Sequence, residues 1–508
     1  EALDKPLADE EDGHTDTGEG QVTHGSFKRV HNVWTASAYQ VLMMASWTCN
    51  IVLYGTVFDV GGPMMLIYST IIVTCGQCLL MASLGECVRF GHTPGVSSTA
   101  YTKHLAPVYA RCFLSYLIGW MVYLGEIAAS AGCAMNSAQI ITAVVQLHDP
   151  SYVPTRWHTW LIYGAILLAS ILFSFSRRHL LAVTVIGGML TLGGGIAWAV
   201  TFLVLADKHD AAFLFHHLVN QSGYTSIGWV GLLSFYTPVY TLYGTDGILH
   251  ITEEIRDPER NAPRAMVLSM GFSGITSLMG AVVLGFCAGD WQSYMQSDLP
   301  FIPWFVETLG SGTGAIVLAI VVLVFLNFLI TVCINTAASR MAWSMAIDSA
   351  LPYSEVFQRL SPTFDTPVNT ILLTVAAEMV IGLVVFGSDY AFQAIVSLGG
   401  VAIQIEYLTP VLMLIIRGRS VLPGDRYFDL GRLGLVVNVA SVCWSLLIIV
   451  ILLYVLLLLL SMYFPSDGTE TDGVDNMNWA GVMCGGLVII VTVDWVLRGR
   501  FHYTVPAA

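Results

Sequence analysis

The chain has 508 residues, of which 55% are apolar and only 11% are charged, and its net charge is −14. A soluble domain carries roughly a quarter charged residues, so this composition excludes an ordinary soluble protein and predicts an all-α integral membrane protein. Eight acids fall within the first nineteen positions, and residues 1–33 are expected to form a disordered acidic tail in the cytosol. No nucleic-acid partner is expected.

Apolar segments of about 20 residues, each long enough to cross roughly 30 Å of hydrocarbon, recur along the chain. The twelve predicted spans are 34–58, 62–87, 111–146, 157–175, 180–206, 228–256, 265–290, 313–346, 368–387, 390–416, 434–460 and 478–499. They divide into a first set of five within 34–206, an external loop at 207–227, a second set of five within 228–416, two further helices with connecting loops within 417–499, and a cytosolic tail at 500–508. The chain should therefore cross a lipid bilayer many times.

Lysine and arginine predict the orientation. With the N-terminus in the cytosol, 19 of the 21 basic residues lie inside, and only Arg156 and Lys208 lie outside. A bias of this size in short loops sets topology, so both termini are expected in the cytosol. The external loop contains the sequon Asn220-Gln221-Ser222, which makes Asn220 a candidate glycosylation site.

Polar residues and glycines interrupt the first and sixth spans, which occupy corresponding places in the two sets of five. A break in a helix survives at membrane depth only where it lines a cavity or packs against protein. Paired interrupted helices are typical of inverted-repeat transporters, whose substrate lies between them at the midplane. The candidate substrate-binding residues from these two breaks are Ser46, Trp47, Thr48, Asn50, Tyr54, Tyr240, Tyr243, Gly244 and Asp246.

Each of these candidates has an alternative interpretation. The aromatic residues could meet a substrate ammonium group through their ring faces, or they could simply pack or lie at the interface. Asp246 stands between two glycines and is expected to cap the half-helix at 248–254, with direct substrate contact as the alternative.

Buried polar residues elsewhere add further candidates. Glu126 in the third span could pair with a substrate ammonium group or carry a coupling proton; otherwise it bridges helices as a hydrogen-bonded side chain. Thr331 and Asn335 are one turn apart in the eighth span, where they could line the cavity or bond between helices. Glu378 and Glu406 are expected to be structural.

Charged residues gather where the sixth span reaches the cytosol. Glu253, Glu254, Arg256, Arg264 and, from the eighth span, Arg340 are expected to form ion pairs that close an inner gate. Surface ion pairs contribute less than about 1 kcal/mol each, which suits a gate that must open. The alternative is plain anchoring by positive residues.

No metal, cofactor or catalytic site is predicted. Most of the ten cysteines fall in apolar spans, where cysteine behaves as a small hydrophobic residue. The sequence has no phosphate-binding GxxxxGK[ST] loop and no evident nucleophile–base set. An enzyme and an ATP-driven pump are thus not expected, and a proton gradient is the expected energy source.

Several motifs together resemble one family. They are Gly244-x-Asp246 with His250, Glu253-Glu254, Pro258 and Pro263-Arg264; Thr336 to Trp343 with Ile347-Asp348 and Leu351-Pro352; Thr366-Pro367-Val368-Asn369; and Met477-Asn478. At these residues the chain resembles the amino acid–polyamine–organocation superfamily, in its fungal branch of GABA, choline and related amine permeases. The resemblance implies the LeuT-like fold, with an inverted repeat of five plus five helices followed by two more, and proton-coupled symport.

The first span departs from the family pattern. Many relatives have a glycine-rich break there that cradles a carboxylate, whereas this chain has the single Gly55, which favours an amine-type or bulkier solute. The predicted function is secondary transport of an amino acid or amine across the plasma membrane, with the vacuolar membrane as the alternative. A nutrient sensor that kept the transporter fold, and a carrier of an amine-bearing secondary metabolite, are the other hypotheses.

Overall fold

The computed structural model describes residues 29–88, 99–149, 151–221, 225–310, 313–364, 366–424, 426–462 and 480–503. Within these ranges, ten helices are long and apolar enough to cross a membrane. They are α4 (Gly62–Cys87), α6 (Arg111–His148), α7 (Arg156–Ser174), α8 (Arg177–Leu205), α13 (Pro258–Phe286), α16 (Thr313–Ile347), α18 (Val368–Gly382), α19 (Asp389–Arg417), α20 (Gly434–Met462) and α21 (Ala480–Asp494). The protein is a multi-pass membrane protein.

Two further apolar segments are broken into short helices. The first comprises α1 (Val33–Met44), α2 (Ser46–Val52) and α3 (Tyr54–Asp59). The second comprises α10 (Ile227–Leu233), α11 (Tyr236–Thr241), α12 (Gly247–His250) and the 3₁₀ turn η2 (Thr252–Glu254). We call them the first and second interrupted segments.

Three sequence-based boundaries differ from the structure. Ser46 to Asn50, expected to be irregular, are helical in α2, and the breaks lie on either side, at Ala45 and Leu53. α13 begins at Pro258 rather than near residue 265, because proline is well suited to the first helical position. Residues 30–32, assigned to the disordered tail, are ordered: the backbone N–H groups of Val30 and His31 donate to Glu254 O at 2.8 and 2.9 Å.

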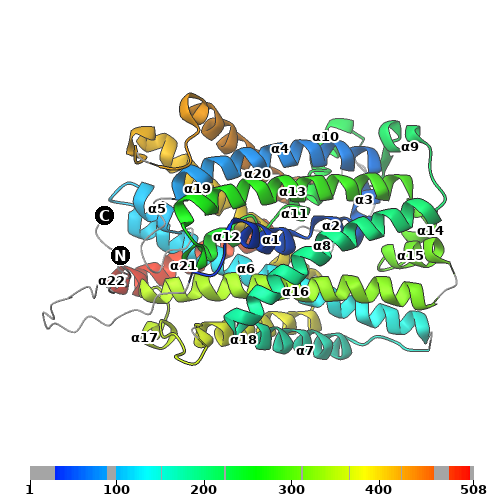
Figure 1. Ribbon diagram of the computed structural model, residues 1–508, viewed down its shortest axis with the longest axis horizontal. Helices are drawn as coiled ribbons and strands as arrows, with labels where there is room; N and C mark the ends of the chain where they lie inside the picture. Colours follow the sequence, from blue (N-terminus) through cyan, green and yellow to red (C-terminus); the bar gives the residue numbers. More distant parts are fainter. Residues whose placement is uncertain are drawn as a thin grey trace, which may run out of the picture.

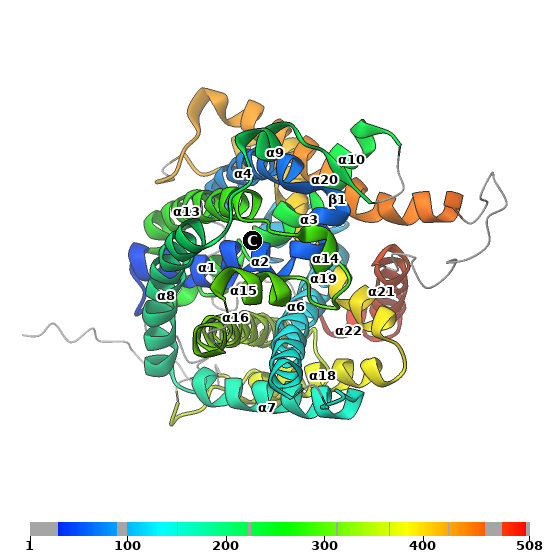
Figure 2. The same ribbon diagram turned by 90° about the vertical axis from the view of Figure 1, so that its right-hand side faces the viewer.

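The long helices run side by side, with the interrupted segments in the middle (Figures 1 and 2). α13 packs on α4, and α6 packs on α16 and α19, while α20 and α21 lie at the rim (Figure 2). The helix α5 (Thr99–Leu105) lies at one end of the bundle and α15 (Phe301–Leu309) at the other (Figure 1), and we call these the α5 end and the α15 end.

Short elements complete both ends. They are α9 (Ala211–His216), α14 (Trp291–Tyr294), α17 (Ser354–Phe357), α22 (Arg500–His502), η3 (Leu383–Phe386), η4 (Arg419–Val421), η5 (Gly431–Leu433) and the π-helical turn η6 (Trp495–Gly499). The strands β1 (Val60–Gly61) and β2 (Val219–Asn220) form an antiparallel pair in which Val60 faces Asn220. Asn220 is exposed there, and Ser222 of its sequon lies outside the described residues.

Glycines let α13 approach its neighbours closely. A Cβ atom added at Gly274 would overlap the Thr74 side chain of α4 and lie 3.2 Å from the Thr74 Cβ atom. One added at Gly280 would lie 2.8 Å from Asn50 Nδ2 in the first interrupted segment. Between apolar helices in lipid, such small residues permit the close packing that holds a bundle together.

We expect Gly274→Ala to lower the free energy of unfolding by about 1–3 kcal/mol, because the new methyl group overpacks this helix crossing. Gly271→Ala is the matched control, since it lies one turn earlier on α13 and an added Cβ atom there would meet no described atom within 4 Å. Thermal unfolding of the detergent-solubilised variants measures the difference. Equal melting temperatures for the two variants would contradict the packing argument.

Candidate functional site

The two interrupted segments meet in the middle of the bundle. Residues 242–246 are non-helical, and Gly244 has a φ of +88°, in the left-handed region that favours glycine. In the first segment the break falls at Ala45, with a φ of 35° and a ψ of 48°. Met43, two residues before that break, lies against the other: a Cβ atom added at Gly244 would be 3.2 Å from Met43 Cγ. The two breaks therefore form one contact region.

Side chains from other helices satisfy the backbone at the second break. Gln40 of α1 donates from Nε2 to Thr245 O at 2.6 Å and accepts from Ile248 N–H at 3.2 Å. The hydroxyl of Tyr407 in α19 accepts from Asp246 N–H at 3.2 Å. Because unsatisfied backbone groups are expensive in the bilayer, these contacts make the irregular backbone tolerable there.

A cavity of about 250 Å³ lies beside the two breaks. α1, α2, α6, α16, α19 and the second interrupted segment all contribute to its walls. It continues into a wider vestibule of about 1380 Å³ that shares Asn136, Gln139 and Gln393 with it. The vestibule is lined further on by residues of α15, such as Ile302 and Val306, so the cavity communicates with the α15 end.

Glu126 of α6 is the one charged side chain among the described residues that line the cavity. The residue is only 1% exposed, and neither carboxylate oxygen accepts a hydrogen bond from a described residue. Tyr236, Tyr240 and Tyr243 add aromatic side chains to the same cavity, with ring centroids 5.1 Å apart for the first pair and 5.7 Å for the second. An uncompensated carboxylate beside aromatic rings is suited to bind a cation.

Asp246 lies behind the cavity wall. Its Oδ1 accepts from the Tyr407 hydroxyl at 2.6 Å and its Oδ2 from His250 Nε2 at 2.9 Å. The prediction that its side chain caps the following half-helix is wrong: it makes no capping bond, and the Asp246 carbonyl accepts from Leu249 N–H at 2.7 Å instead. The carboxylate is occupied by these two side chains.

Glu126, Asp246 and His250 form a compact buried cluster. One side-chain donor or acceptor atom from each lies within 4.8 Å of the other two. Both oxygens of Asp246 already accept hydrogen bonds, and His250 Nε2 is used in one of them. In this arrangement the Asp246 carboxylate and His250 Nε2 are bonded to each other, and both Glu126 oxygens and His250 Nδ1 have no hydrogen-bond partner among the described residues.

Four of the twelve residues predicted to bind substrate line the cavity, namely Glu126, Tyr240, Tyr243 and Gly244. The other eight lie outside its lining: Ser46, Trp47, Thr48, Asn50, Tyr54, Asp246, Thr331 and Asn335. Several of them join helices instead. Trp47 Nε1 donates to Thr191 O of α8 at 2.8 Å, and Asn50 Nδ2 donates to Ser277 O of α13 at 2.8 Å. The part these residues play in binding stays a prediction.

Sequence reasoning missed some of the lining. Asn136 and Gln139 follow Glu126 along α6 in steps of three and four residues, through Ala129 and Cys133, and this spacing places them on a shared region of the helix. Periodicity could therefore have found them. Gln40, in contrast, carries no local signal, because its importance comes from a segment some 200 residues away.

Buried ion pairs lie at the α5 end, where the gating residues were predicted. Arg340 Nε of α16 donates to Glu254 Oε1 at 3.0 Å, and both residues are buried. Lys103 of α5 pairs with Asp348 after α16. Of the other predicted gating residues, Arg256 and Arg264 are exposed and Glu253 is half-buried.

His31 is a buried residue at this end that the sequence did not single out. Its backbone N–H donates to Glu254 O, and its carbonyl accepts from Arg256 N–H at 2.8 Å. Burial lowers the pKa of His31; the nearby Glu254 carboxylate opposes this shift, and the Arg340 guanidinium adds to it. The imidazole is therefore held neutral in the closed arrangement.

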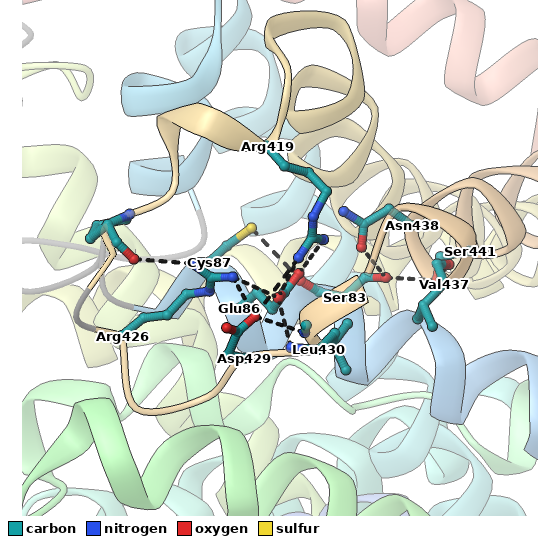
Figure 3. A network of polar contacts seen from close by, with 12 residues as sticks. Ser83, Glu86, Cys87, Arg419, Arg426, Asp429, Leu430, Val437, Asn438 and Ser441 are labelled. Atoms are coloured by element: carbon teal, nitrogen blue, oxygen red, sulfur yellow. Dashed lines mark hydrogen bonds and ion pairs between the residues drawn. The ribbon is translucent and has the colours of Figure 1, made fainter. Parts of the chain in front are cut away.

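A separate network of charged side chains anchors the loop between α19 and α20 (Figure 3). Glu86, buried at the end of α4, accepts from both terminal nitrogens of Arg419 at 2.6 and 2.8 Å and from Leu430 N–H at 2.9 Å. Arg426 pairs with Asp429 in the same group. This network ties the loop between α19 and α20 to α4 and lies apart from the cavity.

A bundle with two broken segments around a cavity that opens at one end defines a membrane transport protein. The comparison with known proteins makes this specific. Residues 32–490 match the family described as "Amino acid permease", and the chain belongs to that family. It is a permease and not an enzyme.

Curated relatives cover nearly the whole chain. It is 25% identical to the "Choline transporter" of Saccharomyces cerevisiae, over 98% of this chain and 86% of that protein. It is 26% identical to "Amino-acid permease 2" of Neurospora crassa, over 94% and 86%. It is also 26% identical to "Amino-acid permease BAT1" of Arabidopsis thaliana, over 94% and 93%.

Arg340→Gln should open the α5 end, because it leaves the buried Glu254 carboxylate without its partner. Breaking a buried ion pair costs about 3–5 kcal/mol, so we expect at least a tenfold faster reaction of a maleimide with Cys333, which is buried on α16. The experiment uses a variant that retains Cys333 as its single cysteine. Arg264→Gln removes an exposed arginine and is the control; equal rates in the two variants would exclude the ion pair from the closure.

Closure should also weaken in acid. An open α5 end returns His31 to water, where it binds a proton more readily than in the closed state, so protons favour opening as pH falls below about 6.5. Above that pH, His31 binds few protons in either state, and protonation no longer favours opening. Cys333 labelling should therefore accelerate in acid relative to the same measurement in His31→Gln, which corrects for the thiol's own pH dependence. If the ratio of the two labelling rates, with His31 and with His31→Gln, stays constant from pH 8 to pH 5, protonation of His31 does not control the opening.

Proposed function

We propose that this permease moves a small amine-bearing solute, an organic amine or an amino acid, by alternating access and with a proton gradient as its energy source. The observation that carries the proposal is the Glu126 side chain, which lines the cavity and whose carboxylate oxygens accept no hydrogen bond from a described residue. An ammonium group of the solute would supply the missing positive charge.

The cavity lining favours amines over zwitterions within this range. No lysine, arginine or histidine is among its described lining residues, so a substrate carboxylate would meet no cationic side chain there. The tyrosines and Met43 offer polarisable surfaces to an organic cation. A volume of about 250 Å³ lies below the roughly 300–1,000 Å³ typical of drug-sized ligands, which suits a small solute. The names of the relatives, a choline transporter and amino-acid permeases, support this class.

The architecture we propose has twelve spans in a LeuT-like arrangement. The two interrupted segments would each be the first span of a five-span repeat, within 34–206 and 228–416, and residues 417–499 would add two further spans. The meeting of both breaks beside the cavity supports this arrangement, because substrate sites of such transporters lie between two discontinuous helices.

We place the α5 end in the cytosol, with residues 1–33 and 500–508, and the α15 end outside, with the loop 207–227 and the exposed Asn220 available for glycosylation. The distribution of lysine and arginine supports this orientation. The structure then represents an outward-facing state, with its vestibule open and its cytosolic ion pairs closed. The plasma membrane is the proposed location, with the vacuolar membrane as the alternative.

Counterflow in proteoliposomes tests the function. Choline, butylamine, γ-aminobutyrate and a panel of α-amino acids are each preloaded, and uptake of the labelled compound is followed. We expect the amines to exchange and Glu126→Gln to raise their half-saturation concentration at least tenfold, because the charge partner is lost. Glu378→Gln, which neutralises a buried carboxyl outside the cavity lining, is the control. Amine exchange unchanged by Glu126→Gln would contradict the assigned site, and no exchange of any compound would contradict the function.

A further inference from the structure

Glu126 and Asp246 share one buried cluster but differ in how their charges are balanced. Asp246 accepts hydrogen bonds from Tyr407 and from His250, whereas Glu126 accepts none from any described residue. Both are almost fully buried, and their carboxylates approach within 4.8 Å. Two like charges so close in a medium of low dielectric constant cannot both persist unless a cation joins them.

The contacts decide which of the two carboxyl groups is neutralised. Ionised Asp246 is stabilised by its two donors, and its carboxylate does not line the cavity. Glu126 lines the cavity, and the cavity leads through the vestibule to water at the α15 end. A proton or a cationic solute can therefore reach Glu126 from that side, and each would cancel the same negative charge.

Other ionisable groups surround this pair, and one of them, Glu406, is a further buried carboxyl group whose oxygens accept no hydrogen bond from a described residue, so it adds to the negative charge that a cation would offset. Those within electrostatic range of Glu126 are Asp246 and His250 of the second interrupted segment, Glu406 and Tyr407 of α19, Tyr39 of α1, Tyr240 and Tyr243 in the cavity wall, and Cys133 of α6 itself. His250 is turned toward Asp246 through Nε2. Arg340, from α16, is bonded to Glu254. His250 and Arg340 are thus bonded to acids other than Glu126.

We propose that a proton and the ammonium group of the solute compete for Glu126, so that the permease exchanges one amine for one proton. This rests on the proposed function and replaces its expected symport with exchange. When the amine arrives, the proton leaves a Glu126 carboxyl oxygen for water in the vestibule, and the ammonium group takes its place beside the carboxylate. The reverse occurs after the cavity opens at the other end. The cluster carries the same net charge with either occupant, so the exchange is electroneutral.

Calorimetry on the purified protein tests the competition directly. Choline and butylamine are titrated at several pH values, in buffers that differ in their heat of ionisation, which counts the protons released on binding. At pH values where Glu126 is protonated in the free protein, we expect one proton released per amine and a dissociation constant that rises tenfold for each unit by which the pH falls. Glu126→Gln should release none and bind independently of pH, while Glu378→Gln should behave as the unaltered protein. Binding of either amine without proton release would overturn the proposal.

Transport gives a second readout. In proteoliposomes with the membrane potential clamped at zero, an acidic interior should drive amine accumulation, and imposing a potential should leave the rate unchanged. Accumulation driven by an acidic exterior would show symport and overturn the exchange. The two failures are distinguishable: amines that bind and exchange without releasing protons refute this inference alone, whereas a protein that binds and exchanges no amine at any pH refutes the proposed function.

Discussion

The structure depends on how the bilayer interior treats a broken helix. Backbone N–H and C=O groups freed between α11 and α12 have no water to bond, so other helices must satisfy them. Gln40 of α1 bonds to Thr245 within the break and to Ile248 just after it, and Tyr407 of α19 bonds to Asp246 at the end of the break. The broken segment is therefore held between two helices, and the cavity lies beside it.

The same contacts set the electrostatics of the cavity. Tyr407 serves both the backbone N–H and the carboxylate of Asp246, so the residue that holds the break open also compensates the charge next to it. His250 completes that compensation from within the segment. Glu126 on α6 accepts no hydrogen bond from a described residue, which leaves its carboxyl group open to the proton or amine proposed above. The hydroxyl of Tyr407 thus serves both the broken backbone and the buried acid beside the cavity.

Sequence reasoning predicted the long helices well, because the ends of a continuous apolar run such as Gly62–Cys87 can be located in the sequence itself. It also found the second break at Gly244 and the unusual charge at Glu126, because glycine and an acid in an apolar run are local signals. It failed where the outcome depends on distant partners. No residue near Ala45 in the sequence predicts its left-handed backbone conformation. At Asp246, the side chain bonds to Tyr407, 161 residues away, instead of capping the helix that follows.

The closure at the α5 end shows why burial matters more than the number of charges. The sequence offers a cluster of acids and arginines, but Arg256 and Arg264 stand in solvent, where ion pairs contribute little. Glu254 and Arg340 are buried, so each needs the other whenever the end is closed and can hydrate separately when it opens. Their attraction in the buried pair is thus balanced against the hydration that each would gain in water.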